Sequence, residues 1–163
     1  MRTPVRSFVL ASALGLLATG AHAEGEHRFL TKALQGDNSE MTLGELAAAN
    51  GQSQGVRDFG KMLHDDHAAA KQKALVVARA HGVADTDEMA PEAKAEERKL
   101  NGLHGEAFDH EFARYMVKDH KKDIAEFRKE ERSGDTATAD LARNTLPDLE
   151  KHLRTAQSLV DKP

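Results

Sequence analysis

The chain contains no cysteine and no tryptophan among its 163 residues, and aromatic residues make up only 4% of it. Without cysteine the protein can form no disulfide, no thiolate metal site and no lipid anchor on a cysteine. A metal site would have to use the nine histidines and the 27 acidic residues. Because β-sandwiches require many aromatic and β-branched residues, this composition favours closely packed helices.

A long apolar run occurs only at the N-terminus. Two arginines precede the apolar residues 8–18, and Ala21-His22-Ala23 is a small-x-small cleavage motif. This pattern predicts a secretory signal peptide over residues 1–23. The mature domain, residues 24–163, contains no run that is apolar enough to span a bilayer. We therefore expect a periplasmic protein without a membrane span.

Charge argues against one class of partner. Removal of Arg2 and Arg6 with the signal peptide leaves 21 basic residues against 27 acidic ones, a net charge near −6. Proteins that bind nucleic acid present clustered Lys and Arg to the phosphates. We therefore expect no nucleic-acid partner, and the sequence identifies no protein partner.

Four long segments carry apolar residues at three- and four-residue steps, which predicts four amphipathic helices over residues 26–50, 54–80, 106–132 and 136–161. The segment Gly36-Asp37-Asn38-Ser39 weakens the first helix, so two shorter helices remain possible there. Pro147 lies inside the last pattern, so that helix must kink or restart there, with Thr145 as a possible cap.

The connections between these helices predict the topology. Gly51 stops the first helix and Ser53 caps the second, and such a short link makes the two helices an antiparallel hairpin. The last two helices form a second hairpin through Ser133-Gly134. Residues 83–104 are long enough to cross the bundle, and Pro91 begins a short helix there. We predict an all-α, ferritin-like four-helix bundle of two antiparallel hairpins joined by a long crossover that contains a short helix.

One polar residue in each predicted long helix stands where the apolar pattern requires a core residue: Glu40, His67, His120 and His152. A buried polar group without a partner costs roughly 1–3 kcal/mol. At 1.5 Å per residue, Glu40 and His67 differ in height by roughly 6 Å, and His120 and His152 by roughly 5 Å. Because long side chains span such differences, we predict one shared site in the middle of the bundle.

The ligand types of this predicted site indicate a transition metal. Three imidazoles and one carboxylate suit Zn, Cu, Ni or mononuclear Fe better than Mg or Ca. His64, three residues before His67, is a possible fifth ligand. Asp66 and Asp119 each precede a core-facing histidine. Because adjacent residues do not share a helix face, we interpret these two as partners of the ligands or as surface charges.

The sequence does not indicate an enzyme. A di-iron carboxylate site requires Glu-x-x-His on two helices, and the residue three before His152 is Leu149. The chain also lacks a nucleophile elbow, a phosphate loop and a Ser/His/Asp set. We predict no catalytic residue, and no cofactor other than the metal ion.

A second interpretation is that the inward polar residues bind no metal. A glutamate and neighbouring histidines can form charged hydrogen bonds with one another, and these bonds raise the pKa of the histidines. The chain would then be a metal-free periplasmic structural or stress-related interaction protein with an internal Glu/His hydrogen-bond network.

Short motifs spread over residues 28–159 also carry a family resemblance. They are Phe29-Leu30, Ser39-Glu40-Met41, Leu43-Gly44-Glu45-Leu46-Ala47, Val56-Arg57-Asp58-Phe59-Gly60, Met62, Asp66-His67, Phe108-Asp109, Tyr115, His120, Leu146-Pro147-Asp148-Leu149 and His152-Leu153. As a set they resemble a bacterial exported family catalogued as domain of unknown function 4142.

The resemblance implies a ferritin-like helical bundle and no established activity. The family pattern includes a Glu, an Asp-His pair, a His and a Pro-x-x-x-x-His, which implies functional positions at Glu40, Asp66-His67, His120 and Pro147 with His152. Its members are often labelled outer membrane proteins. Because the mature chain has neither a predicted membrane span nor a cysteine for a lipid anchor, we expect the periplasm instead.

Overall fold

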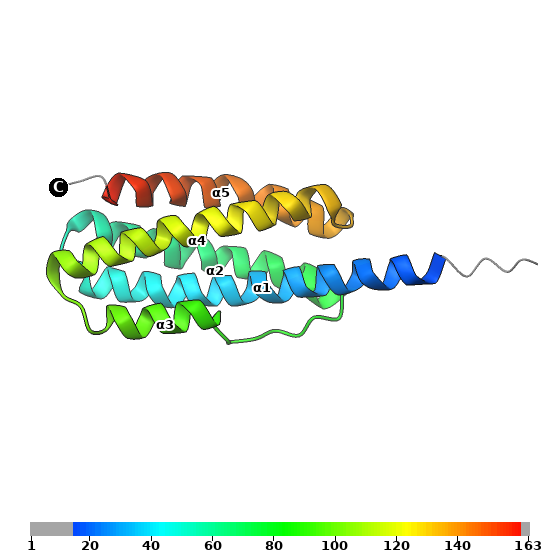
Figure 1. The fold of residues 1–163 in the computed structure, drawn as a ribbon, viewed down its shortest axis with the longest axis horizontal. Helices are drawn as coiled ribbons and strands as arrows, with labels where there is room; N and C mark the ends of the chain where they lie inside the picture. Colours follow the sequence, from blue (N-terminus) through cyan, green and yellow to red (C-terminus); the bar gives the residue numbers. More distant parts are fainter. Residues whose placement is uncertain (1–14, 161–163) are drawn as a thin grey trace, which may run out of the picture.

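The computed structural model describes residues 15–160, and within that range it contains five α-helices and no strand. The helices are α1 (Gly15–Asn50), α2 (Gln54–Ala80), α3 (Pro91–Leu100), α4 (Gly105–Ser133) and α5 (Thr136–Val160). The all-α prediction is confirmed. The four long helices lie side by side, and α3 runs along the outside of them (Figure 1).

The first helix begins earlier than predicted. Residues 1–14 of the predicted signal peptide lie outside the described residues, and residues 15–23 form the start of α1. Alanine and leucine are good helix formers, so the helix continues backward from the predicted start at residue 26. This end of α1 projects beyond the other long helices (Figure 1). No helix within residues 15–160 has both the length and the apolar character needed to cross a membrane.

The first helix is also continuous through Gly36-Asp37-Asn38-Ser39, where two shorter helices were possible. These side chains find partners on other elements. Asn38 donates to the carbonyl oxygen of Thr86 at 2.6 Å, and the Ser39 hydroxyl accepts from the amide of Ala90 at 3.0 Å. The Ser39 hydroxyl also donates to the carbonyl oxygen of Gln35 in its own helix at 2.6 Å. Bonds to the crossover therefore help to keep these residues in the helix.

The last helix does not restart at Pro147, contrary to one of the two predicted outcomes. The hydroxyl of Thr145 donates to the carbonyl oxygen of Leu141 at 2.8 Å, so Thr145 lies within the helix rather than capping a new one. Leu146 and Leu149 on either side of the proline are both buried. Packing on both sides therefore holds the helix together across the missing backbone donor.

The helices of the first hairpin lie very close together where Gly44 faces Gly60. A Cβ atom added to Gly44 would lie 2.6 Å from the carbonyl oxygen of Gly60, and one added to Gly60 would lie 2.5 Å from that of Gly44. No larger residue fits at either position without moving a backbone. This contact sets the spacing of α1 and α2 about two turns from His67.

Replacing Gly60 with alanine should therefore destabilise the protein. Overpacking costs typically 1–3 kcal/mol, and for a domain of this size that is a fall in Tm of roughly 3–10 °C in a thermal circular-dichroism scan. Gly36→Ala is the matched control, since its nearest neighbouring atom would be 3.9 Å away. The control should be neutral or stabilising. A Gly60→Ala protein as stable as the native one would show that the helices do not meet at these glycines.

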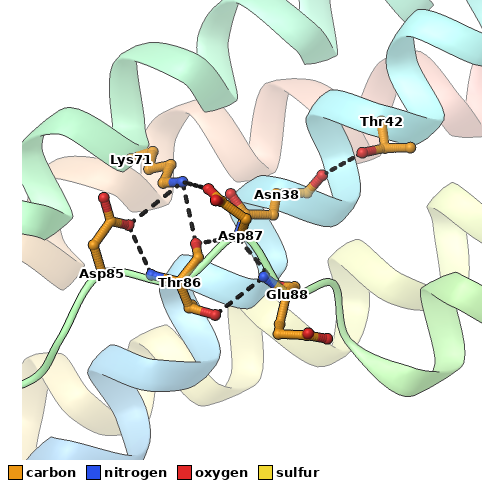
Figure 2. A network of polar contacts seen from close by, with 7 residues as sticks. All are labelled: Asn38, Thr42, Lys71, Asp85, Thr86, Asp87 and Glu88. Atoms are coloured by element: carbon orange, nitrogen blue, oxygen red, sulfur yellow. Dashed lines mark hydrogen bonds and ion pairs between the residues drawn. The ribbon is translucent and has the colours of Figure 1, made fainter.

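A network of polar contacts joins the crossover between the hairpins to α1 and α2 (Figure 2). Lys71 on α2 donates to the carbonyl oxygen of Thr86 at 3.2 Å, and its Nζ lies 3.5 Å from Asp85 and 3.6 Å from Asp87. Asn38 on α1 donates to the same carbonyl group. Two helices thus hold the start of the crossover in one place.

Buried apolar residues lie on both sides of a polar layer. Along α2, His67 lies between the buried Leu63 and Ala74, and these two belong to different apolar clusters. The larger cluster includes Phe59, Phe108 and Phe112, and the other includes Phe29 and Leu30. The interior is therefore apolar toward both ends, and histidines occupy its middle.

Candidate metal centre

Three histidines from three helices meet in this layer: His67 of α2, His120 of α4 and His152 of α5. One ring nitrogen from each lies within 4.8 Å of the other two. The ring centroids are 5.3 Å apart for His67 and His152, 5.4 Å for His120 and His152, and 6.1 Å for His67 and His120. All three side chains are buried. The structure therefore brings together three of the four residues predicted to share a site.

The hydrogen bond of His120 fixes its tautomer. Its Nδ1 lies 3.0 Å from the carbonyl oxygen of Met116, one turn earlier on α4. A carbonyl oxygen only accepts, so Nδ1 carries the proton and donates it. The lone pair of the neutral ring is therefore on Nε2.

His67 and His152 are each held by a carboxylate from another helix. Nδ1 of His67 donates to Oδ1 of Asp37 on α1 at 2.9 Å. Nε2 of His152 donates to Oδ2 of Asp66 on α2 at 2.8 Å. Metal-binding histidines almost always donate their second ring N–H to such a group, which orients the ring and raises its basicity. Asp66 is thus the hydrogen-bond partner of a candidate ligand, which matches one of the two roles predicted for it.

The three remaining ring nitrogens have no hydrogen-bond partner among the described residues. They are Nε2 of His67, Nε2 of His120 and Nδ1 of His152. Because the other nitrogen of each ring carries the proton, these three present lone pairs, and lone pairs cannot bond to one another. A hydrogen-bond donor such as water can satisfy each of them singly, whereas one metal ion can satisfy all three together. Three imidazoles are a donor set that suits Zn, Cu, Ni or Fe.

Burial favours the neutral, metal-binding form of two of these rings. It lowers the pKa of His120 well below the usual range, and positive charge on His67 and His152 would lower that pKa further. Burial also lowers the pKa of His152, although the hydrogen bond to Asp66 opposes this effect. Metal ions bind the neutral imidazole, so at neutral pH no proton has to be displaced from either ring.

A pocket of about 170 Å³ reaches this centre. His67 and His152 line it on the inside, and the exposed residues Lys73, Asn144 and Asp148 line its outer part. The pocket therefore ends beside two of the three histidines, and the unpaired ring nitrogens themselves remain buried.

Glu40 lies outside the histidine cluster, and among residues 15–160 no carboxylate oxygen joins the three ring nitrogens that lie within 4.8 Å of one another. Its side chain is 1% exposed, and neither oxygen has a hydrogen-bond partner with good geometry among residues 15–160. Burial raises its pKa well above the usual range, and the charge of Asp119 on α4 adds to this. The α1 carboxylate that meets His67 is Asp37, one turn earlier. Helical phase did not identify Asp37, because its Gly-Asp-Asn-Ser context is typical of a turn.

His64, the possible fifth ligand, also lies apart from the cluster. Its Nδ1 is 3.1 Å from Oδ1 of the neighbouring Asp65, and its side chain is 42% exposed. The structure does not bring it to the centre.

A second group of possible metal ligands lies where α2 ends and α5 begins. His81 lies 3.8 Å from Glu26 and 3.3 Å from Asp135, and these residues each offer one ligand atom within 4.8 Å of the others. The amide of Asp135 also donates to Glu26 at 2.7 Å. His81 follows the end of a helix, so no helical phase could identify it. Both ring nitrogens of His81 face carboxylates, whereas each central histidine has one ring nitrogen without a partner among the described residues.

Comparison with known proteins identifies the family. The model of DUF4142, a domain of unknown function, matches residues 11–159. The chain belongs to the DUF4142 family. This match confirms the resemblance found in the sequence, and it assigns DUF4142 no activity.

A solved structure is similar in fold to this DUF4142 chain. It is the crystal structure of a DUF305 fragment from Deinococcus radiodurans, with a TM-score of 0.73 and 18% identity over 83% of this chain and 95% of that one. At this identity the likeness concerns the fold alone. No curated protein matches the DUF4142 chain significantly.

Proposed function

We propose that this protein binds one transition-metal ion through His67, His120 and His152, and that it stores, buffers or senses that metal. The observation that carries the proposal is the meeting of three buried ring nitrogens that have no partner and whose tautomers are fixed from outside. Zn, Cu, Ni and Fe match the donors. A site with three protein ligands leaves a fourth position for water or another ligand.

We also propose that the domain is an exported, ferritin-like four-helix bundle. The pairing of α1 with α2 and of α4 with α5, joined by a connection that contains α3, supports this topology. The projecting end of α1 supports cleavage after residue 23, since the other long helices do not extend alongside it (Figure 1). The periplasm is the compartment that the N-terminal pattern favours.

The metal-free alternative accounts for fewer of the contacts. Hydrogen bonds between histidine and carboxylate do occur, but they use only the outer nitrogens of His67 and His152. These bonds do not close the network, because the inner nitrogens lack partners among the described residues. Unpaired buried groups cost about 1–3 kcal/mol each. A closed network would give each of the inner nitrogens a hydrogen-bond partner.

Elemental analysis of the untagged mature protein tests the proposal. We expect about one equivalent of a transition metal, as four-coordinate protein sites hold a single ion. Returning that metal to chelator-treated protein at 100 times its Kd should stabilise the fold by about 2.7 kcal/mol, a rise in Tm of roughly 5–10 °C. Absence of metal, together with an unchanged Tm on adding Zn, Cu, Ni or Fe, would favour the metal-free alternative.

A further inference from the structure

A group of one histidine and two carboxylates joins the two hairpins near the point where α1 leaves the bundle (Figure 1). Glu26 comes from α1, His81 follows the end of α2, and Asp135 precedes the start of α5. One ring nitrogen and one oxygen of each carboxylate lie within 4.8 Å of one another. Among residues 15–160, the central histidines form the only other group that meets this limit.

The spacing of these atoms is wider than that of direct hydrogen bonds. Nε2 of His81 lies 3.3 Å from Oδ2 of Asp135, and Nδ1 lies 3.8 Å from Oε2 of Glu26. An N–H···O hydrogen bond spans about 2.7–3.2 Å. Zn²⁺ binds histidine nitrogen and carboxylate oxygen at about 2.0–2.2 Å, so two such ligands at a tetrahedral angle are about 3.3–3.5 Å apart. The pair of His81 and Asp135 thus has the spacing of two ligands on one ion.

Charge at His81 also favours an ion. A neutral imidazole carries one N–H, so the lone pair of its other nitrogen faces carboxylate oxygens, which carry only lone pairs themselves. A second proton on the ring or a metal ion beside it would remove this repulsion. A doubly protonated ring would form charge-assisted hydrogen bonds of about 2.7–2.9 Å to the carboxylates. The wider spacing observed around His81 therefore fits the metal ion better.

Both carboxylates are oriented by hydrogen bonds to their other oxygen. Oε1 of Glu26 accepts from the amide of Asp135 at 2.7 Å, and Oδ1 of Asp135 accepts from the amide of Thr138 at 2.8 Å. The bond from Thr138 also lowers the pKa of Asp135, which keeps this ligand ionised. The ring of His27 donates to the carbonyl oxygen of His81 and holds the turn after α2. Ligands that are fixed in this way are typical of metal sites.

Apolar packing holds the same three segments together. Glu26 is the third residue after the predicted cleavage position, and its side chain is buried. Phe29, one turn later on α1, belongs to the same apolar cluster as Ala78 and Val83, which lie on either side of His81. We therefore expect the group to persist in the mature domain.

We propose that Glu26, His81 and Asp135 bind a second metal ion, Zn²⁺, separately from the histidine centre. Zn²⁺ accepts both imidazole and carboxylate ligands, and water completes a site with three protein ligands. The two sites lie roughly 20 Å apart along α2. The side chains of His81 and Asp135 are 18% and 41% exposed, so water weakens the binding relative to three buried imidazoles. The second site therefore stays largely empty at the Zn²⁺ concentration that saturates the histidine centre.

Calorimetric titration of the chelator-treated mature protein with Zn²⁺ tests the proposal. We expect a tight class of site at the central histidines and a weaker class at His81. His120→Ala should keep only the weaker class, so failure of the histidine centre and failure of this site are distinguishable. His81→Ala should keep the tight class and weaken the other about 100-fold or more, because it removes a ligand.

Two further variants make the result specific. Asp135→Asn keeps an oxygen that accepts from the amide of Thr138 and caps α5, but it lacks the carboxylate charge. It should weaken the second class about tenfold or more in a chain that still folds. His110→Ala removes an exposed histidine near the start of α4, at the far end of that helix from Asp135, and should bind Zn²⁺ like the native chain.

Two results would overturn the proposal. One is a native chain without the weaker class of site, and the other is a weaker class that neither His81→Ala nor Asp135→Asn changes. Either result would leave His81 as a ring that only pairs with the two carboxylates.

Discussion

Replacing His120 with alanine should abolish stoichiometric metal binding. The inner Nε2 of His120 is one of the three proposed donors, and α4 offers no other histidine in the cluster. Loss of a hydrogen-bonding partner of a ligand costs 10–100-fold in metal affinity, so loss of a ligand itself should cost about 100-fold or more. Elemental analysis should find no retained metal, and the rise in Tm on adding metal should disappear.

The metal-induced change in Tm is the informative quantity, because alanine also leaves a cavity between Met116 and Ile124 that lowers stability without metal. His64→Ala is the matched control. It removes a half-exposed imidazole from the helix that carries His67, and it should retain the metal and the rise in Tm. Full metal content in His120→Ala would show that the three rings do not form the centre. Loss of metal in His64→Ala would restore the fifth-ligand prediction.

Replacing Asp123 with asparagine should stabilise the metal-free protein increasingly as the pH rises. Burial and Asp119 raise the pKa of Asp123 to about 8 in the folded state, whereas its usual value is 3.8. Between these values the folded chain holds a proton that the unfolded chain has lost. Through this group, the free energy of unfolding of the native protein therefore falls by up to about 1.4 kcal/mol per pH unit. Asparagine does not titrate, so the variant lacks this decrease.

Unfolding measured at intervals from pH 5 to pH 8, with chelator present, tests this expectation. The stability difference between Asp123→Asn and the native chain should grow by up to about 4 kcal/mol over that range. Histidine titration contributes to both proteins, so the difference removes it. Asp140→Asn is the control, because that exposed carboxylate pairs with Arg143 at the surface. A difference that does not vary with pH would mean that Asp123 is ionised in the folded protein.

The three histidines could be predicted because each lies among buried apolar residues at helical spacing. His67 is four residues after Leu63, and His120 is four after Met116 and four before Ile124. That periodicity depends only on the helix and on burial. The partners of the outer nitrogens were harder to predict, since a bond such as that from His152 to Asp66 depends on which helices are neighbours.

Helical phase alone could not predict which carboxylate of α1 meets His67. Glu40 does face the interior, as predicted, but phase does not decide which neighbour it meets. In a hairpin that turns near residues 51 and 52, His67 stands about 15 residues after the turn, level with a residue about 15 before it. That residue is Asp37, which bonds His67, while Glu40 faces Asp119. The sequence did not indicate Asp37, because its Gly-Asp-Asn-Ser context is typical of a turn. In the structure, contacts with α2 and the crossover keep this segment helical despite its local preference.

The division of the histidines between the two hairpins has a consequence for how the protein opens. One ring comes from the α1–α2 hairpin and two come from the α4–α5 hairpin, and each hairpin packs more extensively within itself than against the other. Units of this kind can unfold separately, at less than the full free energy of unfolding. An ion held by both would act as a reversible crosslink and make them unfold together. Metal supply would then set the lifetime of the chain against proteases.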